Sequence, residues 1–376
     1  MNNQVEFIPV FRPTLPSYEE FCSTLKPSYE SGIVTVGKIV ESFEAKAAEY
    51  TGARYAVAVS NCTSGLILAF SALELPLGTE VILPSFTFAA TVQALFWNNL
   101  KPVYVDCLPN TFTIDPEQVE NAIGPETSAI YAVNIFGLPP DVDELTAIST
   151  RHGVPLVFDS AQGLGSLYKD RPSGSFGQCE IFSLSPTKVI TAIEGGLITT
   201  NNDDLAAKLR SMRDYGKGPD GQEMIYNGLS ARMSEFHASI GLLSLRNAEN
   251  LIASRMRLIN AYRDKLGTLP GCSVQEWPND RTSSGNYFTL LIGPKAKADR
   301  ETVYKELLRS QIQSKKYFYP PVHVQSAFRD RPHRIVGELP NTWAASRTSL
   351  ALPLFAHMTD EQHDRVCSVV ERVLGY

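Results

Sequence analysis

Seven short apolar runs recur between residues 55 and 200, and they constrain the fold more than any other feature of the chain. They are rich in β-branched and aromatic residues and do not alternate with polar ones. Such runs are typical of strands buried on both faces of a parallel sheet. We therefore predict an α/β fold in which a mostly parallel seven-stranded sheet is flanked by helices. The runs are Tyr55–Ser60, Val81–Pro84, Val103–Asp106, Ala129–Val133, Pro155–Asp159, Ile181–Ser185 and Gly196–Thr200.

The pattern changes near Met233, from where Leu and Ile are interleaved with Glu, Arg and Asn at helical spacing as far as Leu266. A chain of 376 residues is also long for a single hydrophobic core. We predict a large domain over residues 1–250 and a smaller C-terminal α/β domain over residues 251–376. The expected elements of the small domain are a strand at Tyr287–Ile292 and helices at Arg300–Gln313 and Asp360–Leu374.

Composition argues against several classes of protein. The net charge is −6 and no basic run occurs, which leaves nucleic-acid binding without an electrostatic basis. No apolar stretch is long enough to cross a bilayer, and the N-terminal residues lack the parts of a signal peptide. The six cysteines are scattered, without the spacing of a zinc site or a disulfide framework. We expect a cytoplasmic enzyme without a metal, a membrane or nucleic acid as partner.

One lysine follows the strand Ile181–Ser185, in the segment FSLSPTKVITAIEGG. Lys188 is flanked by apolar residues, hydroxyl residues precede it, and the pair Gly195-Gly196 follows. Partial burial would lower the pKa of this amine and make it a nucleophile toward an aldehyde. The glycines would let the backbone approach a bulky group closely. A lysine after a strand is more often a solvated surface residue, so this segment alone does not identify a site.

Asp159 ends the strand Pro155–Asp159 and is followed by Ser160, Ala161 and Gln162. Ligands of parallel α/β sheets bind at the carboxyl ends of the strands. A carboxylate there is suited to pair with a protonated pyridine nitrogen, which keeps the ring cationic and able to accept electrons. It is equally suited to cap a helix. Both interpretations stay open at this point.

Two further strand ends also allow two interpretations. The segment VSNCTSG, residues 59–65, leads from a strand into the apolar helix Leu66–Leu73. Free amides and hydroxyls at a helix N-terminus bind phosphate, although a simple Ser/Thr cap explains the same residues. After the strand Val81–Pro84, the aromatic residues of SFTF would either stack on a flat ring or pack in the core.

In this order, the segments resemble the fold-type I pyridoxal-phosphate (PLP) enzymes, whose fold is that of aspartate aminotransferase. More narrowly, the chain resembles the DegT/DnrJ/EryC1/StrS family of sugar aminotransferases over essentially its whole length. FSLSPTK and EGGLITTNN, and their spacing from Asp159 and Gln162, carry most of the resemblance. It continues in LRSMRDYG, ARMSE, YPPVH and LPL, at residues 209–216, 231–235, 319–323 and 352–354.

The resemblance implies roles for individual residues. Lys188 would bond to the aldehyde of the cofactor and later move a proton between the cofactor and the substrate carbon. Asp159 would hold the pyridine N–H, and Gln162 would hydrogen-bond the ring hydroxyl. Phe88 would stack on the face of the ring.

The cofactor phosphate would be held by Ser183 and by the backbone and hydroxyl around Cys62 and Thr63. The chain departs from the family pattern at two positions. Cys62 stands where glycine is usual, so the loop must bind with a Cβ present. Ser230 stands where relatives have an asparagine that reaches the phosphate of the neighbouring subunit. Ser230 is shorter, and Asn227 is a second candidate for this contact.

The resemblance also implies a two-stage exchange. An amino donor, expected to be glutamate, passes its amine to the cofactor, and a ketone then receives it while Lys188 moves the protons. Related dehydratases carry histidine at the position of Lys188, so a PLP-dependent dehydratase or lyase is the less favoured alternative. A silent binding module would lack Lys188 or Asp159, and both are present. NCTSG is not GxGxxG, which argues against an oxidoreductase.

The expected ketone is a nucleotide-linked sugar. Ile193–Gly196 (IEGG) resembles the enzymes that aminate C4, which predicts a dTDP-linked 4-keto-6-deoxy sugar converted to a 4-amino sugar. A C3-aminating or an aminocyclitol aminotransferase is the alternative. The stretch Tyr317–His323 is expected at the site's mouth, with Tyr319 and His323 binding substrate, although it also fits a proline-stiffened loop. Relatives are homodimers with shared active sites, so we expect a homodimer.

Overall fold

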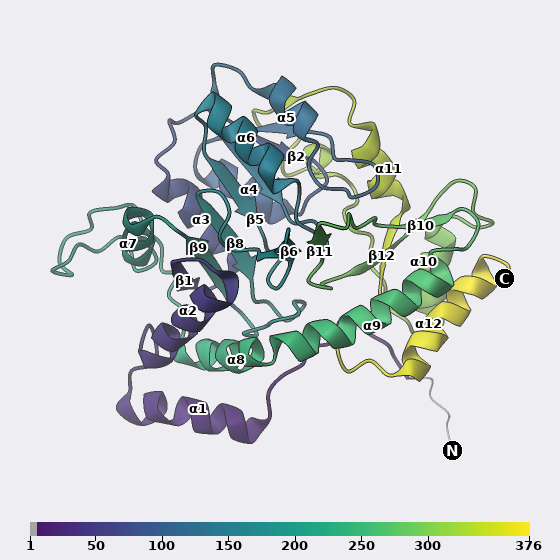
Figure 1. The fold of residues 1–376 in the computed structure, drawn as a ribbon, viewed down its shortest axis with the longest axis horizontal. Coiled ribbons are helices and arrows are strands. Elements are labelled where there is room, and N and C mark those ends of the chain that lie inside the picture. The colour runs from purple at the N-terminus through teal and green to yellow at the C-terminus, as the bar shows by residue number, and fades with distance from the viewer. Residues whose placement is uncertain (1–5) are drawn as a thin grey trace.

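The computed structural model describes residues 6–376 and places one large sheet at the centre of the molecule (Figure 1). The strand order is β1-β9-β8-β5-β4-β2-β3-β13. β9 is antiparallel to both neighbours, and the other pairings are parallel. All seven predicted strands are confirmed. They are β1 (Tyr55–Val59), β2 (Glu80–Pro84), β3 (Lys101–Val105), β4 (Thr127–Val133), β5 (Leu156–Asp159), β8 (Cys179–Ser183) and β9 (Gly196–Thr200).

Both faces of this sheet are covered by helices, which explains why its strands are apolar without alternation. In β2, Val81 and Leu83 pack into one core with α3, α4 and α7, whereas Ile82 packs into a second core with α5 and α6. Side chains that alternate between two buried faces must all be apolar. The covering helices are α3 (Cys62–Ala72), α4 (Ala89–Trp97), α5 (Pro116–Ala122), α6 (Val142–His152) and α7 (Asp203–Met212).

Two N-terminal helices that the sequence analysis did not predict, α1 (Tyr18–Ser31) and α2 (Lys38–Thr51), pack beside α8 (Glu235–Arg246) (Figure 1). Glu235 is fully buried and fastens them to the large domain. Its carboxylate accepts hydrogen bonds from the Ser28 hydroxyl at 2.7 Å and from the Gly37, Ile39 and Val40 amides at 2.9 Å. A carboxylate at the first turn of α2 also interacts favourably with that helix's dipole.

The small domain follows the long helix α9 (Ala248–Leu266) and has its own core around Tyr262, Phe288 and Leu352. The predicted strand is β12 (Phe288–Ile292), and the last predicted helix is α12 (Asp360–Val373). The helix predicted over Arg300–Gln313 ends sooner, as α10 (Arg300–Arg309). Two strands that had not been predicted, β10 (Cys272–Val274) and β14 (Ser349–Leu352), flank β12.

Part of the range 251–376 returns to the large sheet. β13 (Arg334–Ile335) pairs with β3 as an eighth strand, after a short 3₁₀ turn at Val322–Val324. The helix that follows, α11 (Pro340–Thr348), is capped from the large domain. The buried carboxylate of Asp106 accepts the Asn341 amide at 2.8 Å and the Thr342 amide at 2.7 Å. Since backbone amides are free only at a helix start, this contact fixes where α11 begins.

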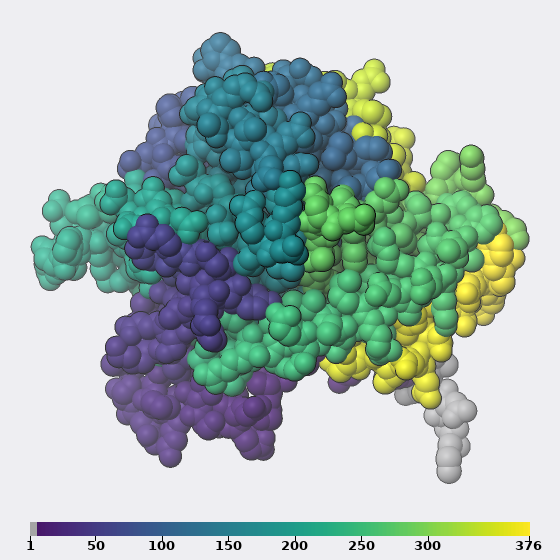
Figure 2. All heavy atoms as spheres, in the orientation of Figure 1, coloured from purple at the N-terminus to yellow at the C-terminus, as the bar shows by residue number. Residues whose placement is uncertain are grey.

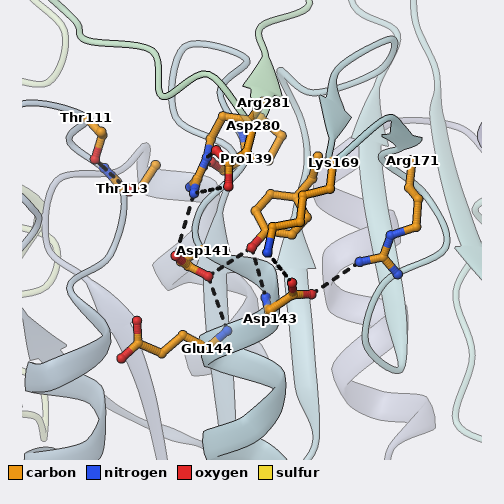
Figure 3. A network of polar contacts seen from close by, with 11 residues as sticks. Thr111, Thr113, Pro139, Asp141, Asp143, Glu144, Lys169, Arg171, Asp280 and Arg281 are labelled. Atoms are coloured by element: carbon orange, nitrogen blue, oxygen red, sulfur yellow. Dashed lines mark hydrogen bonds and ion pairs between the residues drawn. The ribbon is translucent and has the colours of Figure 1, made fainter.

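A polar network fastens the chain after α9 onto the large domain (Figure 3). Here β11 (Arg281–Thr282) pairs with β6 (Leu167–Tyr168), and β6 pairs with β7 (Arg171–Pro172). Arg281 donates to the Pro139 carbonyl at 3.3 Å and lies 3.6 Å from Asp141. The Arg281 side chain is buried, so its contacts contribute more to stability than exposed ion pairs, which are screened by water. The segment that leads on to Tyr287 is thereby held against the sheet.

The segment between α7 and α8 extends away from the body of the molecule, at the left of Figures 1 and 2. We call residues 213–231 the arm. Met224 and Ile225 are about half exposed on it. No helix within residues 6–376 combines the length and the apolar character needed to span a bilayer. No group of three or more His, Cys, Asp or Glu side chains in that range is arranged to hold a metal ion.

Candidate active site

A cavity of about 370 Å³ opens at the carboxyl ends of the central strands. Its walls come from the ends of β4, β5 and β8, from the starts of α3 and α4, and from Tyr287, Lys315, Tyr317 and Phe318. This is the edge where parallel α/β sheets bind ligands. Seven of the predicted residues line it: Cys62, Thr63, Phe88, Asp159, Gln162, Ser183 and Lys188.

Lys188 lies in the turn after β8, where its amide donates to the Ser185 carbonyl at 3.0 Å. Its ammonium is 5.7 Å from the centroid of the Tyr287 ring. Burial alone would raise the pKa of Tyr287. The charge of Lys188, the hydroxyls of Thr187 and Tyr317 and the charge of Lys315 outweigh burial, so the pKa of Tyr287 lies below its ordinary value. The charge of Lys188 therefore favours the ionised form of Tyr287 within this cavity.

Asp159 is buried at the end of β5, without an ion-pair partner among residues 6–376. Its carboxylate accepts the Thr91 hydroxyl at 2.7 Å and the Ala161 amide at 3.1 Å. Burial raises the pKa of this carboxyl, although those two bonds and the charge of Lys188 act in the opposite direction. A buried carboxylate with so little compensation favours a cationic partner in the cavity.

The start of α3 forms part of the cavity wall. Asn61 caps the helix by accepting the Ser64 amide at 2.8 Å, which leaves the first-turn amides and the Thr63 hydroxyl at the cavity. Gly196 lets β9 approach this turn, because a Cβ there would lie 2.7 Å from the Cys62 nitrogen. The Cys62 side chain packs into the apolar core, so its Cβ does not obstruct the turn.

Gln162 and Phe88 supply the remaining predicted walls. The Gln162 side-chain oxygen accepts the Phe136 amide at 2.8 Å. Because its oxygen is already engaged, Gln162 has its NH₂ group available to donate to a ligand. Phe88 is 56% exposed, with its ring centroid 6.2 Å from that of Phe318. A large aromatic side chain left this open beside a cavity is suited to stack on a flat ligand.

Comparison with known proteins identifies the family. The model of the DegT/DnrJ/EryC1/StrS aminotransferase family matches residues 17–371. The chain belongs to this family. It is a PLP-dependent aminotransferase of fold type I, and the resemblance inferred from the sequence is confirmed.

Individual relatives of this DegT-family chain match it over nearly its full length. It is 34% identical over 346 residues to a GDP-perosamine synthase of Caulobacter vibrioides, covering 91% of this chain and 92% of that protein. The crystal structure of DesI in the presence of its TDP-sugar product superposes with a TM-score of 0.91 at 34% identity, covering 98% and 93% of the two chains. A DegT/DnrJ/EryC1/StrS aminotransferase from Brucella abortus gives a TM-score of 0.89 at 27% identity, covering 95% and 96%.

The residues present fit PLP. The poorly compensated carboxylate of Asp159 suits the protonated pyridine nitrogen, and the NH₂ group of Gln162 suits the ring hydroxyl. The start of α3, with Thr63 and Ser183, suits the phosphate. Lys188 lines the same cavity as the amine that would meet the aldehyde. These assignments remain our inference from the arrangement of the side chains.

Asn227 and Ser230, the two candidates for a phosphate contact across the dimer, lie on the arm and outside this cavity. Both are exposed. The Ser230 hydroxyl accepts Arg232 at 3.3 Å, and Arg232 also forms an ion pair with Asp214. The predicted contact is with the phosphate in the neighbouring subunit, so it stays a prediction.

Tyr319 and His323, expected to bind substrate, do not line the cavity. Tyr319 is 51% exposed, with the Arg300 guanidinium 4.7 Å from its ring centroid. His323 is buried, and its Nδ1 lies 2.6 Å from the Ser85 hydroxyl. Burial lowers the pKa of His323, with a further contribution from His333. The contact between His323 and Ser85 links the short 3₁₀ turn to the loop after β2.

The sequence analysis missed several residues of the cavity wall. Ser185 and Thr187 stand within the recognised segment FSLSPTK, and their position beside Lys188 was a usable signal. Tyr287 and Lys315 offered no comparable signal, because they come from the chain beyond the large domain. Tyr317 lies within the stretch Tyr317–His323 that was expected at the mouth of the site, and it does line the cavity. Which side chains of that part reach the cavity depends on how it folds back.

Proposed function

We propose that this enzyme transfers the amino group of glutamate to the keto carbon of a nucleotide-linked sugar. Its specific substrate in this proposal is a dTDP-linked 4-keto-6-deoxyhexose, and the product is the 4-amino sugar. One observation carries the proposal: Lys188 and the poorly compensated Asp159 line one cavity at the carboxyl end of the sheet. A nucleophilic amine and a carboxylate in that relation are what PLP chemistry requires.

The chain's own residues divide the work. PLP, when bound, supplies an aldehyde and a ring that accepts electrons. The Lys188 amine removes the proton from the donor's α-carbon in the first stage and delivers one to the sugar carbon in the second. Asp159 keeps the ring nitrogen protonated, and the Thr91 hydroxyl orients that carboxylate. Tyr287 lies beside the Lys188 ammonium, 5.7 Å from it at the ring centroid.

Two relatives support a nucleotide sugar as the acceptor. One is a GDP-perosamine synthase, and the other, DesI, was crystallised with its TDP-sugar product; each is 34% identical to this chain. The dTDP form is our first choice because DesI matches over 98% of this chain. Amination at C4 rests on the resemblance of Ile193–Gly196 to the C4-type enzymes. The corresponding GDP-linked sugar is the second substrate to test.

We further propose a homodimer in which the arm reaches the partner's cavity. Ile33, Val34 and Phe236 are apolar residues near the start of α2 and α8, and all three are at least 38% exposed. Together with Met224 and Ile225 on the arm, they suit burial against a second copy. Sedimentation at micromolar concentration is expected to give the mass of a dimer. A fully active monomer would contradict this arrangement.

The function is tested by combining absorbance with product mass. The purified protein with PLP is expected to show a visible band that L-glutamate bleaches and a keto-sugar nucleotide restores, with one amino group gained by the sugar. NMR of the product would assign the aminated carbon. Loss of water from the sugar without amination would favour the dehydratase alternative. A protein that no amino acid bleaches would contradict the proposed function.

A further inference from the structure

The cavity holds one cation for which the proposed cofactor has no use. The acidic and basic side chains of its wall are those of Asp159, Lys188, Glu194 and Lys315. Asp159 is assigned to the ring nitrogen and Lys188 to the aldehyde. Glu194 is an exposed acid at the rim, and it repels anions there. Lys315 is therefore left as the group that attracts an anionic part of a substrate.

The surroundings of Lys315 keep its ammonium available. Its backbone is fixed to β14 by two hydrogen bonds with Ala351, of 3.0 and 2.7 Å. Its ammonium lies between two rings, 5.5 Å from the centroid of Phe11 and 5.7 Å from that of Tyr317. Within residues 6–376 no carboxylate forms an ion pair with Lys315, whereas its neighbour Lys316 pairs with Glu301 at 3.0 Å. A half-buried cation between aromatic rings is less screened than one in water, so it binds an anion more strongly.

Resting on the proposed function, we propose that Lys315 binds the α-carboxylate of the amino donor. In an amino acid this carboxylate is bonded to the carbon that loses its proton to Lys188, so its partner must line the same cavity. In a nucleotide sugar the whole sugar ring separates the diphosphate from C4. The diphosphate therefore lies farther from the carbon that Lys188 serves than the α-carboxylate of the donor does. An ammonium that donates to a carboxylate forms a charge-assisted hydrogen bond, which is among the stronger polar contacts in proteins.

Measuring the two half-reactions separately distinguishes binding of the donor carboxylate from a structural role of Lys315. The variant is Lys315→Met, which keeps most of the unbranched side chain but removes the ammonium group, and the matched control is Lys316→Met. Both are made in the full chain loaded with PLP. Lys315→Met is expected to raise the concentration of L-glutamate needed for half-saturation by roughly 10- to 100-fold. This is the range expected for losing a hydrogen bond to a charged group. The second half-reaction, started from the amine-loaded cofactor with the keto-sugar nucleotide, is expected to change less than about twofold.

Two donor analogues identify the carboxylate concerned. Isoglutamine, which carries an amide in place of the α-carboxylate, is expected to be a poor donor for the wild type. In Lys315→Met, glutamate and isoglutamine should become nearly equivalent. Binding without turnover is measured by calorimetry with α-methyl-L-glutamate, which has no α-proton to lose. Its affinity should fall in Lys315→Met and stay unchanged in Lys316→Met.

The outcomes distinguish failure of this proposal from failure of the proposed function. If Lys315→Met slows only the sugar half-reaction, the anion it binds is the diphosphate, and the proposal is overturned. Equal losses in both halves, or undiminished preference for glutamate over isoglutamine, also overturn it. If the wild type itself is not bleached by any amino acid, the proposed function fails instead.

Discussion

The two walls of the cavity differ in origin and in chemistry. The large-domain wall consists of residues that follow strands directly, such as Asp159 and Ser183, with Lys188 in the turn after β8. The other wall comes from Tyr287, Lys315, Tyr317 and Phe318, which all follow the long helix α9. The first wall presents the groups that suit a cofactor, and the second presents aromatic side chains and a spare cation. We infer that one wall carries out the reaction common to the family and the other selects the substrates.

The largest effect is expected from the lysine of the cofactor wall. Lys188→Ala removes both the amine that meets the aldehyde and the general base, so product formation should fall by at least about 10⁴-fold. Circular dichroism should show an unchanged fold. Lys101→Ala, at the amino end of β3 and away from the cavity, is the control. Substantial activity in Lys188→Ala would contradict the assignment of the reaction to the large-domain wall.

The carboxylate of the same wall should give the next largest effect, with opposite signs for function and stability. Asp159→Asn removes the partner of the ring nitrogen, and we expect activity to fall by roughly 10²-fold or more. The pKa of Asp159 is raised in the folded protein, so its ionised form destabilises the cofactor-free protein above the unfolded pKa. The variant without cofactor should therefore melt about 1–3 °C higher at neutral pH. A lower melting temperature together with full activity would contradict both expectations.

A residue of the substrate wall should give a smaller effect that leaves the cofactor in place. Tyr287→Phe removes the hydroxyl that contacts Thr187 and Tyr317. We expect turnover to fall by about 3- to 30-fold, because Thr187 and Tyr317 lose a hydrogen-bond partner. The visible band should persist with unchanged cofactor affinity. Tyr29→Phe, on an exposed tyrosine, controls for the substitution. Loss of the band in Tyr287→Phe would mean that the two walls are not separate in function.

The last prediction concerns how the stability of the folded protein depends on pH. Glu180 is fully buried and accepts the Ser160 hydroxyl at 2.7 Å and the Gly174 and Phe176 amides. Burial raises its pKa to about 7, against the partial compensation of those bonds. When folding raises the pKa of a carboxyl, the folded protein loses stability as pH rises from the carboxyl's pKa in the unfolded chain, about 4.3, to its pKa in the folded protein. Above that pH the loss stays constant.

Glu180→Gln replaces the titrating carboxyl with an amide that does not titrate. Relative to the variant, the wild type should lose stability between pH 5 and pH 7 and show a constant difference above pH 8. Chemical denaturation at each pH measures this difference. A difference that does not vary with pH would show that Glu180 does not titrate in this range.

The same contrast explains what the sequence revealed. The strands of the large sheet were predictable because burial on both faces demands apolar runs, and Lys188 and Asp159 stood at their ends. The eighth strand, Arg334–Ile335, was not predictable, because two residues carry no periodicity and their pairing with β3 is set by the returning chain. Tyr319 and His323 were chosen from a stretch of which only Tyr317 and Phe318 line the cavity. Which side of an irregular loop faces a cavity depends on tertiary packing.

The central claim is that the amine at position 188 reaches the aldehyde of PLP in this cavity. The most direct measurement is reduction of the PLP-loaded protein with borohydride, which makes the bond between lysine and cofactor permanent, followed by peptide mapping by mass spectrometry. The account predicts a pyridoxyl-phosphate mass on the peptide that contains Lys188 and on no other. A label on a different lysine, or no label on a protein that had shown the visible band, would contradict it.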